Sequence, residues 1–256
     1  MAFADLGNNV AVGDKTSASS IANSAGVMQA VSAGNLLVLI VGKDNAATAD
    51  GNTNEFTSVT DTKGNTWTKA REFCNAQGAA NAGVTVAVFY SVLTTALVVG
   101  VDVITVNFSD ARTAKAFTTQ RFSIGAGSTV QVAGTPVDLA NDGADPGSMT
   151  ISGLPSAEYL FVRGLAHENP TATLTKTTGY SGFSGLAGTS GGSGVTNIAV
   201  NGEFRILTGT GDTSDPTWTA DDTASVFIAF KEVPPAVEAV FLPRRGSLGQ
   251  DMRLRR

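Results

Sequence analysis

Short apolar segments of strand length, separated by turn residues, recur along most of this chain and restrict it to a β fold. The clearest are residues 35–42 (NLLVLIVG) and 84–93 (VTVAVFYSVL), which are typical of strands buried in a sheet. Residues 102–108 alternate polar and apolar side chains, which indicates a half-buried strand. Further segments of this kind are residues 57–61, 129–133, 148–151, 158–165, 197–206 and 224–230.

Glycine, asparagine and aspartate mark the connections between these segments. Residues 61–68 (DTKGNTWT) predict a hairpin turn, with Trp67 entering the next strand. Residues 142–147 (DGADPG) predict a turn, and residues 185–194 (GLAGTSGGSG) predict a flexible loop. Only residues 16–30 have a composition that suits a helix, and Ser, Thr and Asn weaken that preference.

These patterns predict an all-β, antiparallel β-sandwich over residues 1–232. We expect two sheets packed face to face, with jelly-roll or Greek-key connections. A division into two sandwiches near residues 125–128 is the alternative. Pro234 and Pro235 end the last strand because proline lacks the N–H that a central ladder needs, so residues 233–256 are expected to form an extended, basic C-terminal arm.

Charge and hydropathy argue against two classes of partner. The net charge of −5 and pI of about 4.9 leave no broad basic surface for nucleic acid. No apolar run approaches the roughly 20 residues of a membrane span, so no membrane partner is expected. The first ten residues, MAFADLGNNV, lack the basic and apolar regions of a secretory signal, and we expect a protein made and used without such export.

The sequence carries no catalytic motif, and we expect a protein that is not an enzyme and needs no cofactor. Cys74 is the only cysteine and His167 the only histidine, and they lie far apart in the sequence. A lone Cys is more often a small buried residue than a nucleophile, and one His cannot build a zinc site without partners. His167 is expected in a loop. A pair of carboxylates for glycoside hydrolysis would be visible only in the fold, so that alternative stays open.

Four aromatic residues near predicted loops suggest a possible glycan site. Trp218, Tyr180 and Phe183 could stack on sugar rings, because ring faces offer a flat apolar platform, and Trp67 lies at a similar position. The other interpretation is that these rings close the ends of the sandwich core. We favour core packing, most strongly for Trp67.

Acidic residues gather in two predicted loops. Oxygen ligands on loops suit Ca²⁺, but aspartate is also an ordinary turn residue, and the spacing matches no EF-hand. We therefore favour turns and expect no metal site. The residues are Asp142, Asp145, Asp212, Asp215, Asp221 and Asp222.

The C-terminal arm differs from the rest of the chain in charge. Five arginines against Glu238 and Asp251 give residues 234–256 a charge of +3, which leaves −8 on the body. Apolar side chains between the arginines could become buried against a partner. The hypothesis is that the arm docks on an acidic surface of a neighbouring subunit, and the alternative is a frayed basic tail. The partner-binding candidates are Phe241, Leu242, Arg244, Arg245, Arg253, Arg255 and Arg256.

Several stretches also carry a family resemblance. TSVTDTKGNTWTKA (residues 57–70), VTVAVFYSVLTTAL (84–97) and DVITVNFSDARTAKAF (102–117) resemble a β-sandwich type of predicted phage structural proteins and some bacterial surface proteins. Similar pieces continue to VFIAFKEV (226–233), so the resemblance covers nearly the whole body. It brings no catalytic residue with it, and it is more specific for the fold than for a role.

The resemblance, together with the missing export signal, implies a virion structural protein of a tailed bacteriophage. The expected role is a capsid decoration or minor capsid protein, or a tail appendage subunit, assembled in the host cytoplasm and located in the virion. Its partners would be other virion proteins and copies of itself in a homo-oligomer. The alternative function is a glycan-binding module for attachment to the host surface.

Overall fold

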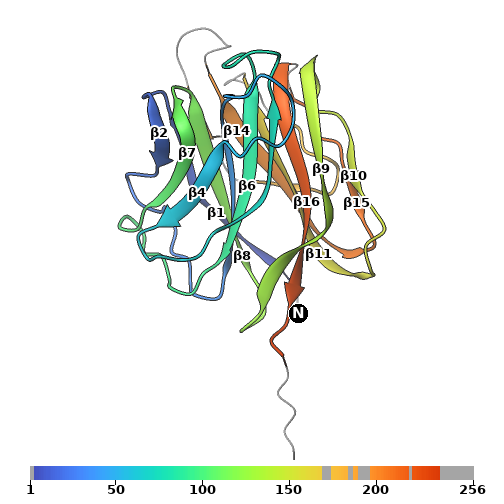
Figure 1. Cartoon of the computed structure of the whole chain (residues 1–256). Coiled ribbons are helices and arrows are strands. Elements are labelled where there is room, and N and C mark those ends of the chain that lie inside the picture. Colours follow the sequence, from blue (N-terminus) through green and yellow to red (C-terminus); the bar gives the residue numbers. More distant parts are fainter. Residues whose placement is uncertain (1–2, 169–173, 184–186, 190–196, 219–220, 237–256) are drawn as a thin grey trace, which may run out of the picture.

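The protein is built from strands alone in the part of the chain that the structure describes. This computed structural model describes residues 3–168, 174–183, 187–189, 197–218 and 221–236. The strands pair antiparallel, apart from one isolated parallel bridge, and form four sheets. The predicted all-β, antiparallel sandwich class is therefore confirmed (Figure 1).

The first half of the chain forms a five-stranded and a three-stranded sheet. The five-stranded sheet has the order β1-β8-β3-β6-β5, and the three-stranded sheet has the order β2-β7-β4. The strand order β1-β8-β3-β6 in one sheet, facing β2-β7-β4 in the other, is that of a jelly roll. Strand β5 is added at the edge of the first sheet, beside β6. The strands are β1 (Ala4–Asp14), β2 (Ala18–Ala22), β3 (Leu36–Asp44), β4 (Phe56–Asp61), β5 (Thr68–Asn75), β6 (Val84–Val92), β7 (Ile104–Arg112) and β8 (Lys115–Ser123).

The second half forms a six-stranded and a two-stranded sheet. The six-stranded sheet has the order β12-β14-β11-β16-β9, with β13 also paired to β14, and the two-stranded sheet joins β10 to β15. The strands are β9 (Thr129–Ala144), β10 (Met149–Ile151), β11 (Ala157–His167), β12 (Ser181–Gly182), β13 (Ala187–Gly188), β14 (Ala199–Gly209), β15 (Asp212–Ser214) and β16 (Asp221–Val233).

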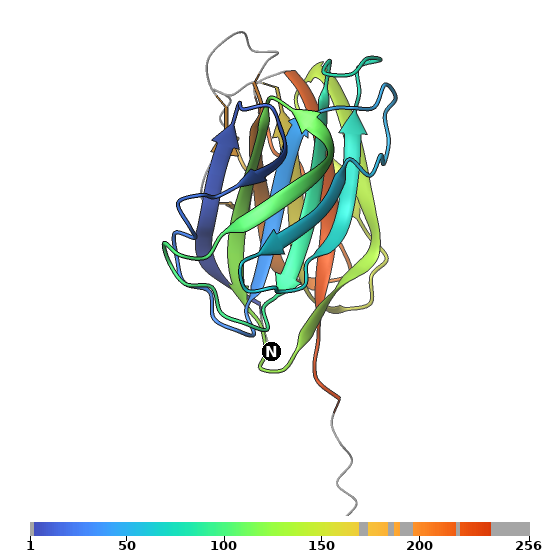
Figure 2. The same cartoon turned by 60° about the vertical axis from the view of Figure 1, so that its left-hand side comes forward.

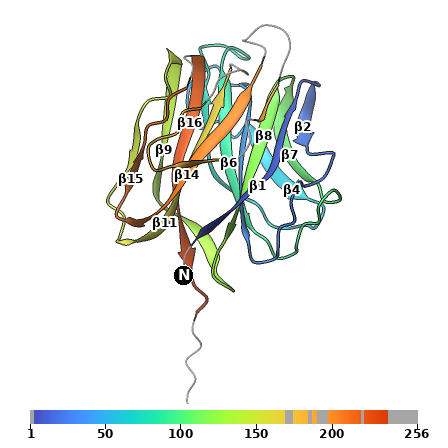
Figure 3. The same cartoon turned by 180° about the vertical axis from the view of Figure 1, so that it is seen from behind.

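The four sheets stack as layers, with the five-stranded and six-stranded sheets in the middle. Leu36, Val38 and Ile40 of β3 pack against the six-stranded sheet in the largest core cluster. Leu37 and Leu39, on the other face of β3, pack against the three-stranded sheet. A third cluster lies between the six-stranded and two-stranded sheets. Figure 2 shows the three-stranded sheet crossing in front of the five-stranded one, and Figure 3 shows the molecule from behind the view of Figure 1.

This layering corrects the expectation of two sheets and explains the sequence pattern. Strand β3 is apolar without alternation because its sheet has a neighbour on both faces. Strand β7 belongs to an outer sheet, and its buried residues Ile104, Val106 and Phe108 alternate with less buried ones, as predicted. Residues 124–128 join the first pair of sheets to the second, where a division was considered, and the largest core cluster is shared by both halves.

Three local predictions were wrong. The turn near Gly64 exists, but β4 and β5 do not form a hairpin, because β4 pairs with β7 in one sheet and β5 with β6 in another. Residues 18–22, in the stretch considered for a helix, form β2. The predicted turn at residues 142–147 begins later, because β9 continues to Ala144 beside the start of β16. No helix in the described ranges is long and apolar enough to cross a membrane.

Buried ions join the layers to each other. Lys43 on β3 donates to Glu55, which precedes β4, over 2.5 Å, and both side chains are almost fully buried. This pair links the five-stranded sheet to the three-stranded sheet. Arg163 on β11 donates to the backbone oxygens of Pro146, Gly147 and Ser214, and thereby links the six-stranded sheet to the segments around β10 and β15.

Candidate functional site

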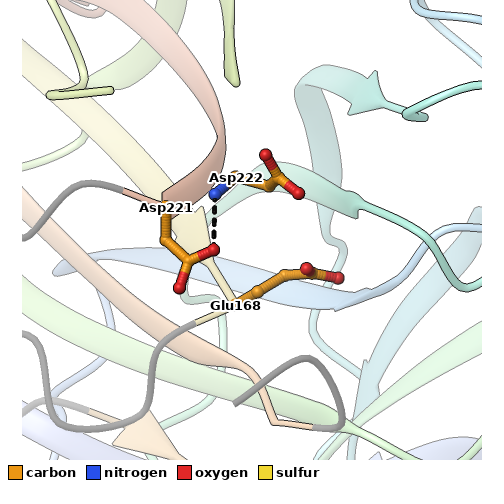
Figure 4. Close-up of side chains that lie close together, drawn as sticks. All are labelled: Glu168, Asp221 and Asp222. Atoms are coloured by element: carbon orange, nitrogen blue, oxygen red, sulfur yellow. Dashed lines mark hydrogen bonds between the residues drawn. The ribbon is translucent and has the colours of Figure 1, made fainter. Parts of the chain in front are cut away.

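Three carboxylates meet at the end of the sandwich where β11 finishes and β16 begins. Glu168 directly follows β11, and Asp221 and Asp222 open β16. One carboxylate oxygen from each lies within 4.8 Å of the others (Figure 4). We call Glu168, Asp221 and Asp222 the acidic cluster, and this end of the molecule the acidic end.

Strand pairing brings these residues together from distant parts of the sequence. His167 pairs with Thr223 in the ladder between β11 and β16, and the Glu168 amide donates to the Asp222 carbonyl over 3.2 Å. The Asp222 amide donates to Asp221 Oδ1 over 3.0 Å, and the Gly143 amide donates to Asp222 Oδ1 over 3.2 Å. Each aspartate therefore has one oxygen held by the backbone.

Glu168 is the most constrained member of the acidic cluster. Its residue surface is only 2% exposed, and Oε1 is buried without a hydrogen-bond partner within the described part of the chain. Burial, reinforced by Asp222, Asp44 and Asp221, raises the pKa of Glu168 to about 8. Burial also raises the pKa of Asp222, where Asp221 and Asp142 reinforce it and His167 opposes it. Acidic groups are therefore crowded at this end, and their proximity makes it harder for each of them to lose its proton.

His167 is buried at the end of β11, so the expectation that it lies in a loop was wrong. Its ring stacks on Trp218, with centroids 4.4 Å apart and planes 10° apart. The Trp218 amide donates to Asp145 Oδ1 over 3.0 Å. The stacked pair covers the outer face of the six-stranded sheet beside the acidic cluster.

The glycan-binding candidates are placed mainly in the core. Trp218, Tyr180 and Phe183 are 6%, 7% and 4% exposed, which leaves little ring face for a sugar. Tyr180 donates its hydroxyl to Asp212 over 2.8 Å, and burial together with that carboxylate raises the pKa of the phenol. Trp67 is partly buried against the core and donates to Asp61. All four rings therefore pack in or against the core, as the second interpretation of the sequence predicted.

The structure separates the predicted acidic groups. Asp212 pairs with Arg205 and Tyr180, away from the acidic cluster, and Asp215 is exposed. Asp145 accepts from Trp218, and Asp142 accepts from Asn75. Asp221 and Asp222 of the predicted set come together, with Asp142 close enough to influence Asp222, and their third partner, Glu168, was missed. No local signal marks Glu168, because its proximity depends on the pairing of β11 with β16.

Cys74 is fully buried, as predicted for a small apolar residue. Burial raises the pKa of its thiol to about 11, which keeps it protonated and a poor nucleophile at neutral pH. The arm candidates Phe241, Leu242, Arg244, Arg245, Arg253, Arg255 and Arg256 lie outside the described residues.

The opposite end of the sandwich is where the C-terminal arm begins. β16 ends there at Val233, which pairs with Thr129, and β1 starts nearby, where Ala4 pairs with Ser123. We call this the arm end. The described large hydrophobic residues that are exposed, named here the apolar patch, are Leu6, Met28, Val98, Val99 and Val101.

Two loops and β1 bring the apolar patch to the arm end. β6 ends and β3 begins at this end, because Leu36 pairs with Val92, and the loops next to them hold Met28 and the three valines. Val27 forms a bridge with Val99, and Arg121 donates to the carbonyls of Leu6 and Ala30. The patch therefore lies on neighbouring segments.

Searches for related proteins returned no matching family model, no matching curated protein and no matching solved structure.

Proposed function

We propose that this chain is a non-enzymatic structural protein that assembles with neighbouring copies in the virion of a tailed phage. The role would be that of a capsid decoration or minor capsid protein, or a tail appendage subunit, fastened through residues 233–256. The observation that carries the proposal is the position of the apolar patch: the exposed large hydrophobic residues of the described chain lie at the end where the arm begins.

Exposed apolar side chains gathered at one end favour contact with another protein. Val98, Val99 and Val101 are 49%, 49% and 65% exposed, although each is apolar and they share one loop. Exposed apolar residues that lie close together mark interaction sites more often than scattered single residues do. The valines therefore offer burial to a neighbouring subunit.

Charge complementarity points to another copy as that neighbour. The arm carries +3 and the body −8, so the arm of one copy is attracted to the body of the next. Residues 234–236 already leave the sheet, because Pro234 and Pro235 cannot continue the ladder of β16. If the arm of each copy binds the body of the next copy, the same contact is repeated between all neighbours, as the assembly of a shell or ring requires.

The body itself favours a building block over a binding module. Jelly-roll connectivity occurs in capsid proteins and in lectins alike, so the fold does not choose between them. The burial of Trp218, Tyr180 and Phe183 favours a structural building block over a sugar-binding module. The buried charged groups Lys43, Glu55 and Arg163 are occupied by contacts between layers, which is a structural use of their charge.

Removing the arm from the encoded protein tests the proposal. The variant ending at residue 236 keeps all of β16, so its far-UV circular dichroism and Tm should match those of the full chain. In purified particles of a phage that encodes it, quantitative mass spectrometry should show at least a tenfold lower copy number. A second variant, in which the five arm arginines are changed to glutamine, keeps the chain length. It should also fold normally and show at least a tenfold lower copy number in the particles.

The unaltered protein also gives a decisive measurement. Its absence from purified particles, or incorporation of the shortened variant at the normal level, contradicts the proposal. Hundreds of copies per particle indicate decoration of the head, and about three, six or twelve indicate a tail or vertex. Binding of the shortened variant to a glycan array would instead favour the module that attaches to host sugars.

A further inference from the structure

We propose that Glu168, Asp221 and Asp222 bind one hard divalent cation of the calcium class, which joins the end of β11 to the start of β16. This inference is independent of the proposed assembly function, because the acidic cluster lies at the opposite end from the arm. It rests on the geometry of three oxygens and on a buried carboxylate oxygen that lacks a partner.

The separation of the carboxylate oxygens suits a single ion. Calcium binds oxygen at roughly 2.3–2.6 Å, so two oxygens on opposite sides of one ion are about 4.8 Å apart. The three oxygens of the acidic cluster all lie within 4.8 Å of each other, and one ion between them can reach all three. Calcium takes about six to eight oxygens, so water would complete the shell.

The unpartnered oxygen of Glu168 points independently to a ligand. A buried carboxylate oxygen normally accepts a hydrogen bond, because burying it without one is unfavourable. Glu168 Oε1 is buried and accepts none within the described residues, and one oxygen of this carboxylate lies within 4.8 Å of an oxygen of each aspartate. A cation would provide the missing partner.

Within the described part of the chain, no salt bridge joins a lysine or arginine to Glu168, Asp221 or Asp222. Asp44 and Asp142 add negative charge beside the acidic cluster. The nearest basic groups act on Asp44, and two of them are used elsewhere: Lys43 pairs with Glu55, and Arg112 pairs with Asp110. The imidazole of His167 lies near Asp222 but is stacked on Trp218. An external divalent cation supplies the charge that these groups do not.

The backbone leaves one oxygen of each aspartate available. Asp221 Oδ1 accepts from the Asp222 amide, and Asp222 Oδ1 accepts from the Gly143 amide. These bonds fix the direction of both carboxylates before any ion arrives. Three protein oxygens make a modest site, so we expect a Kd on the order of 10⁻⁴–10⁻³ M, the range of weak calcium modules.

The test uses the full chain, treated with a chelator and then dialysed, with calcium ion alone as the probe. Isothermal titration calorimetry should give one site in the stated range, and Tm should rise with calcium. Terbium gives a second readout. Trp218 stacks on His167, next to Glu168, so terbium in the acidic cluster should show luminescence sensitised by tryptophan, and calcium should displace it.

Two substitutions localise the site. Asp222→Asn and Glu168→Gln each replace a carboxyl ligand with a neutral amide of the same shape, and either should weaken calcium binding at least tenfold and abolish the rise in Tm. Asp215→Asn is the matched control, because Asp215 is an exposed aspartate from the same stretch of sequence and should leave binding unchanged. Both variants should fold, since each relieves repulsion within the cluster.

Two results overturn the inference. One is the absence of binding heat at calcium concentrations about ten times the upper end of the expected range. The other is calcium binding that Asp222→Asn and Glu168→Gln leave as tight as in the unaltered chain. If one variant fails to fold, the other decides, and Asp221→Asn gives a third measurement.

Discussion

Arg163 shows how a single charged residue is retained inside this protein. Its side chain is fully buried, and burial lowers the pKa of the guanidinium to about 10, although Glu203 and other acids oppose the shift. Three backbone oxygens accept its hydrogen bonds, from Pro146, Gly147 and Ser214. Glu203 lies opposite it in the ladder and accepts from Ser214. The two terminal nitrogens of the guanidinium are thus hydrogen-bonded, whereas Nε has no partner among the described residues.

Replacing Arg163 should therefore be strongly destabilising. Arg163→Met removes the side-chain donor to three backbone carbonyls and the positive charge that faces Glu203, so we expect a loss of about 3–5 kcal/mol in the free energy of unfolding. Urea denaturation followed by circular dichroism measures this value. Arg205→Met is the control, because the Arg205 side chain is 36% exposed and its ion pair should contribute less than about 1 kcal/mol. Equal losses would contradict this account.

Glu55 should make the free energy of unfolding depend on pH in the acidic range. Burial raises its pKa, but Lys43 and the amides of Ala46 and Ala47 outweigh burial, so the net shift is downward from 4.5. The stabilisation is therefore complete above the unfolded-state pKa and is lost as pH falls through the folded-state pKa. Glu55→Gln should cost about 3 kcal/mol at neutral pH, because the buried Lys43 loses its shortest ion pair and keeps only the longer one to Asp110.

The difference between the Glu55→Gln variant and the unaltered protein should shrink as the pH falls below about 4.5. Urea unfolding at a series of pH values measures it. A difference that stays constant down to the acid unfolding limit would show that Glu55 acts through packing and not through its charge.

At the scale of the strands, glycines set how closely the two central sheets approach. A Cβ on Gly202 of β14 would lie 2.3 Å from Ile40 Cδ1 and 2.7 Å from the backbone oxygen of Arg163. A Cβ on Gly42 of β3 would lie 2.5 Å from Ala166 Cβ. A side chain at either position would collide with the facing sheet, and at Gly202 it would also collide with the neighbouring strand β11 of its own sheet. The sheets are thus matched in shape where β3 crosses the second half of the chain.

Gly202→Ala should lower the free energy of unfolding by about 1–3 kcal/mol, because the added methyl group overpacks the core. Gly209→Ala on the same strand is the matched control. The nearest atom to its Cβ would be 3.7 Å away, so it should stay within about 0.5 kcal/mol of the unaltered protein. Thermal and urea unfolding provide the comparison, and similar effects at both positions would contradict the packing argument.

At the scale of the whole molecule, the two ends of the sandwich differ in character. The acidic end gathers Glu168, Asp221 and Asp222, whereas the arm end carries the apolar patch and the start of the arm. Long central strands such as β11 and β16 connect these ends. An ion at one end and a neighbouring subunit at the other could therefore be bound at the same time, without competition.

The apolar patch should contribute to association but not to folding. Changing Val99 and Val101 together to serine should leave Tm nearly unchanged, because both are exposed, and should lower the fraction of oligomer. Size-exclusion chromatography with light scattering measures the mass. Thr135→Ser, an exposed position on β9, is the control. An unchanged mass distribution would mean that the patch is not part of the contact.

The amino-acid pattern alone determined the fold class and most of the longer strands. Strand β3 was recognisable because an uninterrupted apolar run of this length is typical of a strand buried on both faces. Strand β7 was recognisable because alternation of polar and apolar residues indicates a strand with one face exposed to solvent. Strand β8 was missed although it is central, because its buried Lys115, Thr118 and Gln120 hide its position. Those polar groups are satisfied by partners distant in sequence, such as Asp14 and Asp5.

Only the tertiary structure decided how many layers there are and where the acidic cluster forms. The local sequence pattern indicates how exposed to solvent each face of a strand is, but not which sheet packs against that face. Four layers could therefore not be distinguished from two. Asp221 and Asp222 were visible as neighbours in the sequence, whereas Glu168 joins them through the ladder between β11 and β16. Pairing over such a sequence distance depends on the packing of the whole chain, which no short segment encodes.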